Sequence, residues 1–146
     1  MEILTVKKHI DGYLVNGATC FVPAVEGNAQ YELIKQWIDD GNIPEPEFSE
    51  SQLETIVANK FKDAKQKASD SIVVTVDGLV FDGNASARLN MMSAIESYQL
   101  LNITESEWKL ADNSIALVNI NQIKQALALS IQEFGRIVMC NTIDEL

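Results

Sequence analysis

The sequence of 146 residues predicts an α+β protein: a small antiparallel β-meander with a short helix, followed by a unit of order helix, hairpin, helix, hairpin, helix. Two observations predict this fold class. β-prone runs are joined by Asp-Gly and Asn-Gly dipeptides, which favour tight hairpin turns and therefore antiparallel strands. Longer segments repeat apolar residues at helical spacing. Because 47% of the residues are hydrophobic, the chain can offset the entropy cost of ordering, which excludes a disordered tail.

The first 25 residues predict three strands. Asp11-Gly12 and Asn16-Gly17 are the expected turns, since both pairs readily adopt the positive φ angles of a tight hairpin. The third strand, 19–22, begins at Thr19. Pro23 either ends this strand or confines it to a sheet edge, because proline has no amide hydrogen to donate.

A short helix is expected after Gly27-Asn28. Its apolar residues recur at helical spacing: Tyr31, Leu33, Ile34, Trp37 and Ile38. Gly41-Asn42 is a favourable helix end, and Pro44 follows shortly after it. The next residues combine two prolines with like charges and are expected to be extended and exposed. We therefore expect an N-terminal unit over 1–43, an acidic linker over 44–50 and a second unit over 51–146.

The second unit is expected to open with a helix that Ser49 or Ser51 caps, with Gln52 or Glu54 as the reciprocal partner. One apolar stripe runs along this helix: Leu53, Ile56, Val57, Phe61, Ala64 and Ala68. Four lysines fall largely outside the stripe: Lys60, Lys62, Lys65 and Lys67.

Asp77-Gly78 joins two β-prone runs, 72–76 and 79–81, and is the clearest hairpin signal in the chain. A second hairpin is expected around Asp112-Asn113. Between the hairpins lies a helix with apolar residues Leu89, Met92, Ile95 and Tyr98. Asn119 or Asn121 begins a last helix, whose apolar face is Ile120, Ile123, Leu127, Ile131, Phe134, Ile137 and Val138.

The formal net charge of −10 argues against nucleic-acid binding, since an excess of acid repels phosphates. The apolar runs are too short to span a membrane, and the N-terminus lacks the apolar core of a signal peptide, so we expect a soluble intracellular chain. Six acidic residues and no basic one lie between Asp39 and Glu54. A solvated linker followed by a helix with a polar face is favoured there over a docking patch.

Residues suited to catalysis are scarce. His9 is the only histidine. It could form a nucleophilic pair with Cys20 or Cys140, but the sequence offers no third group to orient such a pair. The two cysteines match no zinc spacing and are expected to be free thiols. The side chains of Asp39 and Asp40 point in different directions on a helix and need not share a site. The other candidate carboxylates are expected in turns: Asp77, Asp82 and Asp112. We expect no enzyme activity, no cofactor and no metal site.

Residues 31–44 carry Trp37, Gly41, Asn42 and Pro44 in a Tyr-x-x-Ile-x-x-Trp-x-x-x-Gly-Asn-x-Pro pattern. This pattern resembles a segment that is frequent in small phage and prophage tail-associated proteins. A second stretch, 61–137, carries Asp77, Gly78, Asp82, Ser86, Arg88 and Trp108. It resembles a domain of unknown function found in tail proteins and tail-fibre assembly proteins. In these motifs Asp77-Gly78 would form a hairpin turn, Asp82 or Ser86 would cap the next helix and Trp108 would anchor the second hairpin.

The resemblance brings no catalytic residues and implies a non-enzymatic tail protein, foremost an assembly factor (chaperone) that binds a tail-fibre or tail-spike protein. It would act in the host cytoplasm during assembly or stay in the virion tail. The alternatives are a minor structural component of the tail, or an acidic DNA mimic that inhibits a host nucleic-acid-binding protein. The candidate partner-binding residues are Glu45, Glu47, Glu50 and Glu54. A homo-oligomer is left open.

Overall fold

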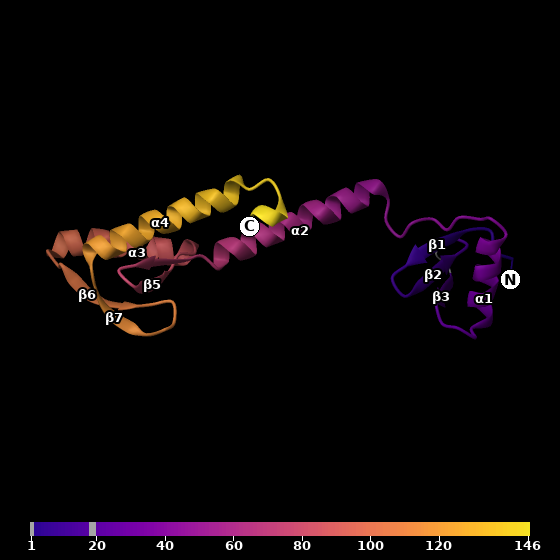
Figure 1. Ribbon diagram of the computed structural model, residues 1–146, viewed down its shortest axis with the longest axis horizontal. Coiled ribbons are helices and arrows are strands. Elements are labelled where there is room, and N and C mark those ends of the chain that lie inside the picture. Colours follow the sequence, from indigo (N-terminus) through magenta and orange to yellow (C-terminus); the bar gives the residue numbers. More distant parts are fainter. Residues whose placement is uncertain (1, 18–19) are drawn as a thin grey trace. The chain divides into compact units, whose positions relative to one another are not determined.

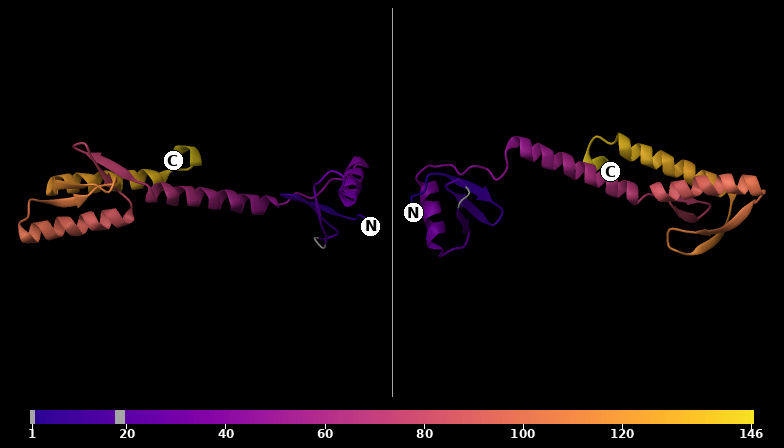
Figure 2. Two further views of the ribbon diagram at one scale, coloured as in Figure 1. Left: turned by 90° about the horizontal axis from the view of Figure 1, so that it is seen from below. Right: turned by 180° about the vertical axis from the view of Figure 1, so that it is seen from behind.

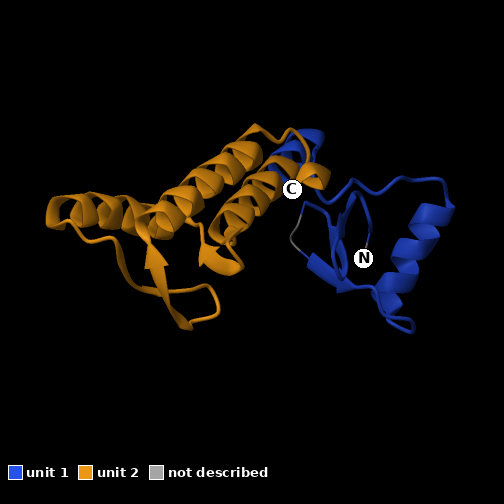
Figure 3. Ribbon diagram, turned by 60° about the vertical axis from the view of Figure 1, so that its left-hand side comes forward, with its two compact units in different colours: residues 1–56 blue, residues 57–146 orange. Residues whose placement is uncertain are grey.

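The computed structural model describes residues 2–17 and 20–146 (Figure 1). The chain divides into two compact units, Met1–Ile56 and Val57–Leu146 (Figure 3). Both combine helices with antiparallel strands, so the α+β prediction is confirmed. Within the described residues, no helix is both long enough and apolar enough to cross a membrane.

A three-stranded antiparallel sheet forms the first unit, in the order β1 (Val6–His9), β2 (Gly12–Val15), β3 (Cys20–Pro23). The predicted meander is confirmed, except at Thr19, which lies outside the described residues. The predicted Asp11-Gly12 turn is wrong by one residue. Because His9 pairs with Gly12, Ile10 and Asp11 form the turn. Gly12 is instead required by close packing, since a Cβ there would overlap the carbonyl oxygen of Val22.

The free edge of β1 is partly covered by the segment that follows helix α1. Glu45 forms an isolated parallel bridge with Lys7. The amide of Lys8 donates to the carbonyl of Glu45 at 2.8 Å, and the amide of Glu45 donates to the carbonyl of Val6 at 2.8 Å. Part of the expected linker is therefore joined to the sheet through its backbone.

Helix α1 (Ala29–Asp39) packs on this sheet. Asn28 caps it by accepting hydrogen bonds from the amides of Gln30 and Tyr31. Gly41 follows the helix with φ +95°, and the side chain of Asn42 donates to the carbonyl of Trp37 at 2.8 Å. The predicted helix and its end are confirmed. The buried core of the unit is Val6, Val15, Val22 and Ile34.

Helix α2 (Glu50–Asp70) is the longest element. Ser49 and Gln52 form the predicted reciprocal cap: the amide of Gln52 donates to the Ser49 hydroxyl, and the Gln52 side chain accepts from the Ser49 amide. None of the 21 residues of the helix is buried.

The second unit contains two hairpins and two further helices. β4 (Val73–Val76) pairs with β5 (Leu79–Asp82), and β6 (Glu105–Lys109) pairs with β7 (Ile115–Asn119). α3 (Ala85–Leu101) lies beside α4 (Ile120–Met139), as both views of Figure 2 show, and α4 also packs on β4 and β7. A short 3₁₀ helix, η1 (Ile143–Glu145), ends the chain. The buried core is Val76, Phe81, Met91, Tyr98, Leu110, Val118, Ile123 and Ala126.

The predicted apolar faces of α3 and α4 are partly wrong. On α3, Met91 is buried, whereas Leu89 and Met92 are 63% and 55% exposed. On α4, Ser130 is fully buried and Ile131 is 52% exposed. The helices carry apolar residues on more than one face, so their spacing alone does not identify the face that packs.

Candidate partner-binding surface

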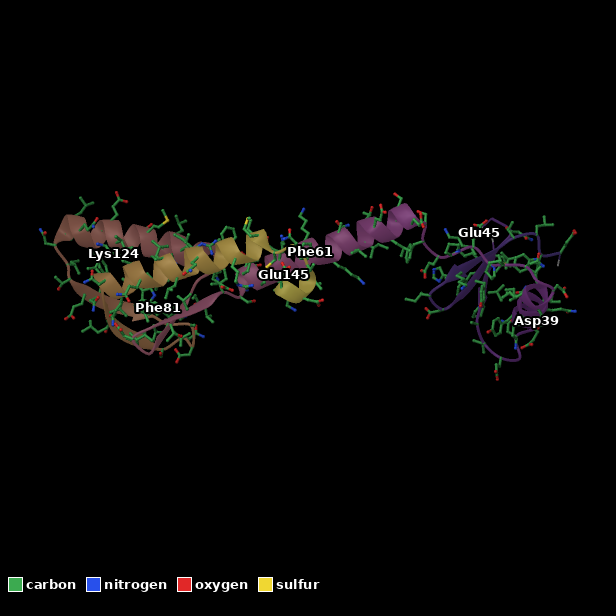
Figure 4. All side chains as sticks on the ribbon, turned by 45° about the horizontal axis from the view of Figure 1, so that its top comes forward. Asp39, Glu45, Phe61, Phe81, Lys124 and Glu145 are labelled. Carbon is green, nitrogen blue, oxygen red and sulfur yellow. The ribbon has the colours of Figure 1, made fainter. Side chains whose placement is uncertain are left out.

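The four glutamates predicted to bind a partner lie along the segment that enters α2 and on its first turns. Glu45 is held by its backbone against β1 (Figure 4), and Glu47 follows in an irregular stretch. Glu50 is in the first turn of α2, where its negative charge interacts favourably with the helix dipole, and Glu54 lies one turn later. The side chains of Glu45, Glu50 and Glu54 are exposed, and Glu47 is half-buried. They therefore form a row along the chain rather than one cluster.

The charge of the chain is concentrated in the first unit. Residues 1–56 contain ten acidic and three basic residues, which gives a formal net charge of −7. Residues 57–146 contain eleven acidic and eight basic residues, which gives a net charge of −3. Among the described side chains the ion pairs are Lys35–Glu32 and Arg136–Glu133, so no lysine or arginine neutralises the four glutamates. Their field is available to attract a basic surface at low salt.

A groove of about 420 Å³ lies between α2 and α4 in the second unit. Phe61, Phe134, Ile137 and Val138 give it apolar walls. Lys65 lies at the groove, where its ammonium donates to the carbonyl of Val138 at 2.9 Å and lies 4.6 Å from the centre of the Phe61 ring. The groove is apolar with a basic margin, which suits an acidic amphipathic segment.

The C-terminal turn is fastened to α4 by Arg136. The guanidinium binds the Glu133 carboxylate with both Nε and Nη2, the latter at 2.7 Å, and donates to the carbonyl of Glu145 at 2.7 Å. The hydrogen bond from Arg136 lowers the pKa of Glu133. The amide of Asn141 donates to the Glu145 carboxylate at 2.7 Å and lowers the pKa of that group. Cys140 is buried beneath this turn, with its Sγ 3.5 Å from the Glu145 carbonyl oxygen.

The four residues singled out in 31–44 pack against the core of the first unit or follow the end of α1. Trp37 packs against the core of the first unit, while Gly41 and Asn42 end α1. Pro44 precedes the residue that bridges to β1. The motif thus describes how α1 ends and how the chain returns to the sheet.

The second motif also describes structure, with one correction. Asp77 and Gly78 form the two-residue turn between β4 and β5, with φ +50° and +79°, as predicted. Asp77 additionally accepts a hydrogen bond from the side chain of Gln122 at 3.0 Å, which ties the hairpin to α4. Neither Asp82 nor Ser86 caps α3. Asp82 is the last residue of β5 and Ser86 already lies inside α3, whereas Asn84 accepts from the amide of Ala87 at 2.9 Å.

Arg88 and Trp108 connect elements of the second unit. Arg88 donates to the carbonyl of Gly83 at 2.7 Å, and its guanidinium lies 4.4 Å from the centre of the Phe134 ring, so it joins α3 to α4. Trp108, on β6, is paired with Ala116 and packs against the core, consistent with an anchor of the second hairpin.

The structure does not bring the candidate catalytic groups together. His9 lies at the end of the sheet where Gly12 pairs with Pro23, and Cys20 lies at the opposite end, beside Val15. Cys140 belongs to the other unit.

The candidate carboxylates have separate structural places. Asp112 accepts from the amide and hydroxyl of Ser114, which lowers its pKa and fixes the second hairpin turn. Asp39 ends α1 and Asp40 is its C-cap residue. In the described part of the chain, no three His, Cys, Asp or Glu residues are placed to hold a metal ion.

Sequence reasoning missed the exposed apolar surface of the second unit. Large side chains that were expected to pack inward are instead exposed, among them Leu89, Met92, Ile131 and Val138. Ile115 and Leu117, on the same face of β7, are 67% and 60% exposed. No protein family model, no curated protein and no solved structure matches the chain.

Proposed function

We propose that this chain is a non-enzymatic bacteriophage tail protein that assists the assembly of a tail fibre by binding the fibre protein. The observation that carries the proposal is the exposed apolar surface of the second unit. It includes Leu89 and Met92 on α3 and Ile115 and Leu117 on β7. Contiguous exposed apolar patches are typical of surfaces that contact another protein, and we propose that these side chains contribute to such a patch.

The resemblance of 31–44 and 61–137 to tail-associated proteins supports the identity of the partner. A long trimeric fibre exposes unpaired strand edges before its three chains find register, and such edges aggregate. An apolar surface on an assembly factor would cover these segments in the host cytoplasm until the trimer forms. The β6–β7 hairpin suits this task, because it is a two-stranded sheet with Ile115 and Leu117 on one face.

The acidic row of Glu45, Glu47, Glu50 and Glu54 would contribute attraction that is readily reversed. Exposed charges speed association more than they add affinity, and salt screens them. A factor that must release its fibre benefits from contacts of this kind. We expect the complex to weaken as the salt concentration rises.

Coexpression with the fibre encoded beside this chain tests the proposal. The expected result is a soluble, trimeric fibre with the chain present and an aggregated fibre without it. Changing Glu45, Glu47, Glu50 and Glu54 to Gln should weaken the complex while changing the free energy of unfolding by no more than about 0.5 kcal/mol, as is usual for exposed positions. Changing Asp11 to Asn and Glu26 to Gln, two exposed acidic residues outside this row, serves as the control for altered surface charge.

A fibre that trimerises equally well without this chain would contradict the assembly role and favour a structural component of the tail, which mass spectrometry of purified virions would detect. The concentration of charge in the first unit favours one further candidate, an acidic inhibitor of a host nucleic-acid-binding protein. A salt-sensitive complex with such a host protein, in place of the fibre, would support that candidate.

A further inference from the structure

Helix α2 exposes two large side chains of its apolar stripe to solvent, and the rest of the stripe is half-buried. From Ser51 to Lys60 every residue except Ile56 is exposed, and Leu53 and Val57 are 47% and 65% exposed. Most helices in proteins are stabilised by packing of an apolar face rather than by helix propensity. The exposed stripe therefore needs a partner.

The charges of α2 are divided between its two halves. The first half, 50–59, carries Glu50 and Glu54 and no basic residue, a net charge of −2. The second half, 60–70, carries four lysines and two aspartates, a net charge of +2. Two copies of the helix that run antiparallel therefore place opposite charges against each other, whereas two parallel copies place like charges together.

The second half of α2 also borders the groove against α4. Phe61 and Val138 line this groove, and Lys62 and Lys65 border it. A segment that fills the groove needs apolar residues flanked by acidic ones. The first half of α2 has this composition, with Leu53 and Val57 beside Glu50 and Glu54.

We infer that this chain forms a homodimer in which the two α2 helices pair antiparallel about a two-fold axis. The first half of each helix lies along the groove between α2 and α4 of the second copy. At about 100° per residue, the side chains of Glu54, Val57, Phe61 and Lys65 fall within an arc of about 80° and so share one face.

One register satisfies both the charges and the sizes of these side chains. With the two-fold axis between Asn59 and Lys60, Glu54 faces Lys65 of the second copy and the small Ala58 faces the large Phe61. The symmetry repeats each contact, so the interface contains two such ion pairs and two such apolar contacts.

Sedimentation of the purified full chain tests the dimer without any fibre, so its outcome is separate from that of the proposed function. We expect a concentration-dependent dimer. Ala58→Asp places a charge against the Phe61 ring of the second copy and should raise the dimer dissociation constant at least about tenfold, and Ala58 is exposed in the single chain. Asn59→Asp is the matched control, because Asn59 is exposed about 160° around the helix from Phe61 and should leave the constant unchanged.

Charge reversal tests the antiparallel register. Glu54→Lys and Lys65→Glu should each raise the dissociation constant about tenfold, while an equimolar mixture of the two variants should dimerise as tightly as the unchanged chain. In the mixed dimer both contacts again join opposite charges. Circular dichroism of each variant establishes that it is folded, and Glu54→Lys alters an exposed side chain only.

Three results would overturn the inference. The first is an unchanged chain that stays monomeric at concentrations of hundreds of micromolar, including one that instead binds an added acidic amphipathic peptide. The second is a dimer that Ala58→Asp weakens no more than Asn59→Asp does. The third is a mixture of the charge-reversed variants that dimerises no better than either variant alone.

Discussion

Gly83→Ala tests the packing of the second unit, because the backbone at Gly83 lies directly against α4. A Cβ at this position would lie 2.5 Å from Cγ2 of Ile72, 2.6 Å from Oγ of Ser130 and 3.1 Å from Cβ of Ser130. Both neighbours are buried, and the Ser130 hydroxyl is already held by the carbonyl of Ala126 at 2.7 Å. Neither side chain can move into solvent to make room.

The expected change in the free energy of unfolding follows from two opposing effects. Inserting an extra methyl group into a well-packed core costs about 1–3 kcal/mol. Replacing glycine by alanine also restricts the unfolded chain, which returns about 0.4–1 kcal/mol. Because two of the contacts are shorter than 3.0 Å and neither buried neighbour can yield, the cost lies in the upper half of its range, about 2–3 kcal/mol. We therefore expect Gly83→Ala to destabilise the second unit by about 1–2.5 kcal/mol.

Each unit contains one tryptophan, which allows the measurement to be assigned. In a Trp37→Phe background, the fluorescence of Trp108 reports unfolding of the second unit in urea. Gly135→Ala, in α4, is the matched control, because a Cβ placed there would meet no described atom within 4 Å apart from its chain neighbours and the adjoining helix backbone. This control should stabilise the unit by up to about 1 kcal/mol. A Gly83→Ala chain as stable as the unchanged one would refute the close approach at Ser130.

Two further predictions concern the β4–β5 turn and the C-terminal turn. Gly78→Val should lower the free energy of unfolding by at least about 1–2 kcal/mol in the same fluorescence assay, because a β-branched residue is strained at φ +79°; an unchanged midpoint would contradict the assigned turn. Because the folded pKa of Glu145 is lowered, its carboxylate stabilises the C-terminal turn above the unfolded pKa, and this contribution disappears as the pH falls through the folded pKa. The amide NMR signal of Asn141 should therefore titrate with Glu145, and a signal that is independent of pH would show that the 2.7 Å hydrogen bond is not formed.

Local signals in the sequence predicted the elements well. The Asp77-Gly78 turn and the Asn119 cap act between residues that are close in the chain, so their chemistry can be read without knowing the fold. The same applies to the cap formed by Ser49 and Gln52.

The faces that pack could not be predicted in the same way. In α3, Leu89 and Met92 have the spacing of a core face, yet Met91 is buried instead, and of the predicted face only Tyr98 is buried. The choice depends on where α4 and the hairpins lie, which is information about distant residues. Ser130 shows the same limit, because the room for its buried side chain is left by Gly83, a residue far away in the sequence.

The candidate surface was predicted in composition but not in structure. The acidic residues from Glu45 to Glu54 were identified from charge alone, and their side chains are largely exposed. That Glu45 is bonded to β1 depends on a contact between residues far apart in the chain, for which the sequence has no local signal. The exposed apolar side chains of the second unit were missed because hydrophobicity was taken to indicate burial.

The bridge between Lys7 and Glu45 has a consequence for how the first unit folds. β1, β2 and β3 pair with their nearest neighbours in sequence, so the hairpins can form early, with short loops to close. The bridge joins β1 to a residue that follows β2, β3 and α1 in the chain, so among the described pairings of this sheet it costs the most loop-closure entropy. During synthesis from the N-terminus, the hairpins can therefore form on the nascent chain, but the edge of β1 stays open until Glu45 has left the ribosome.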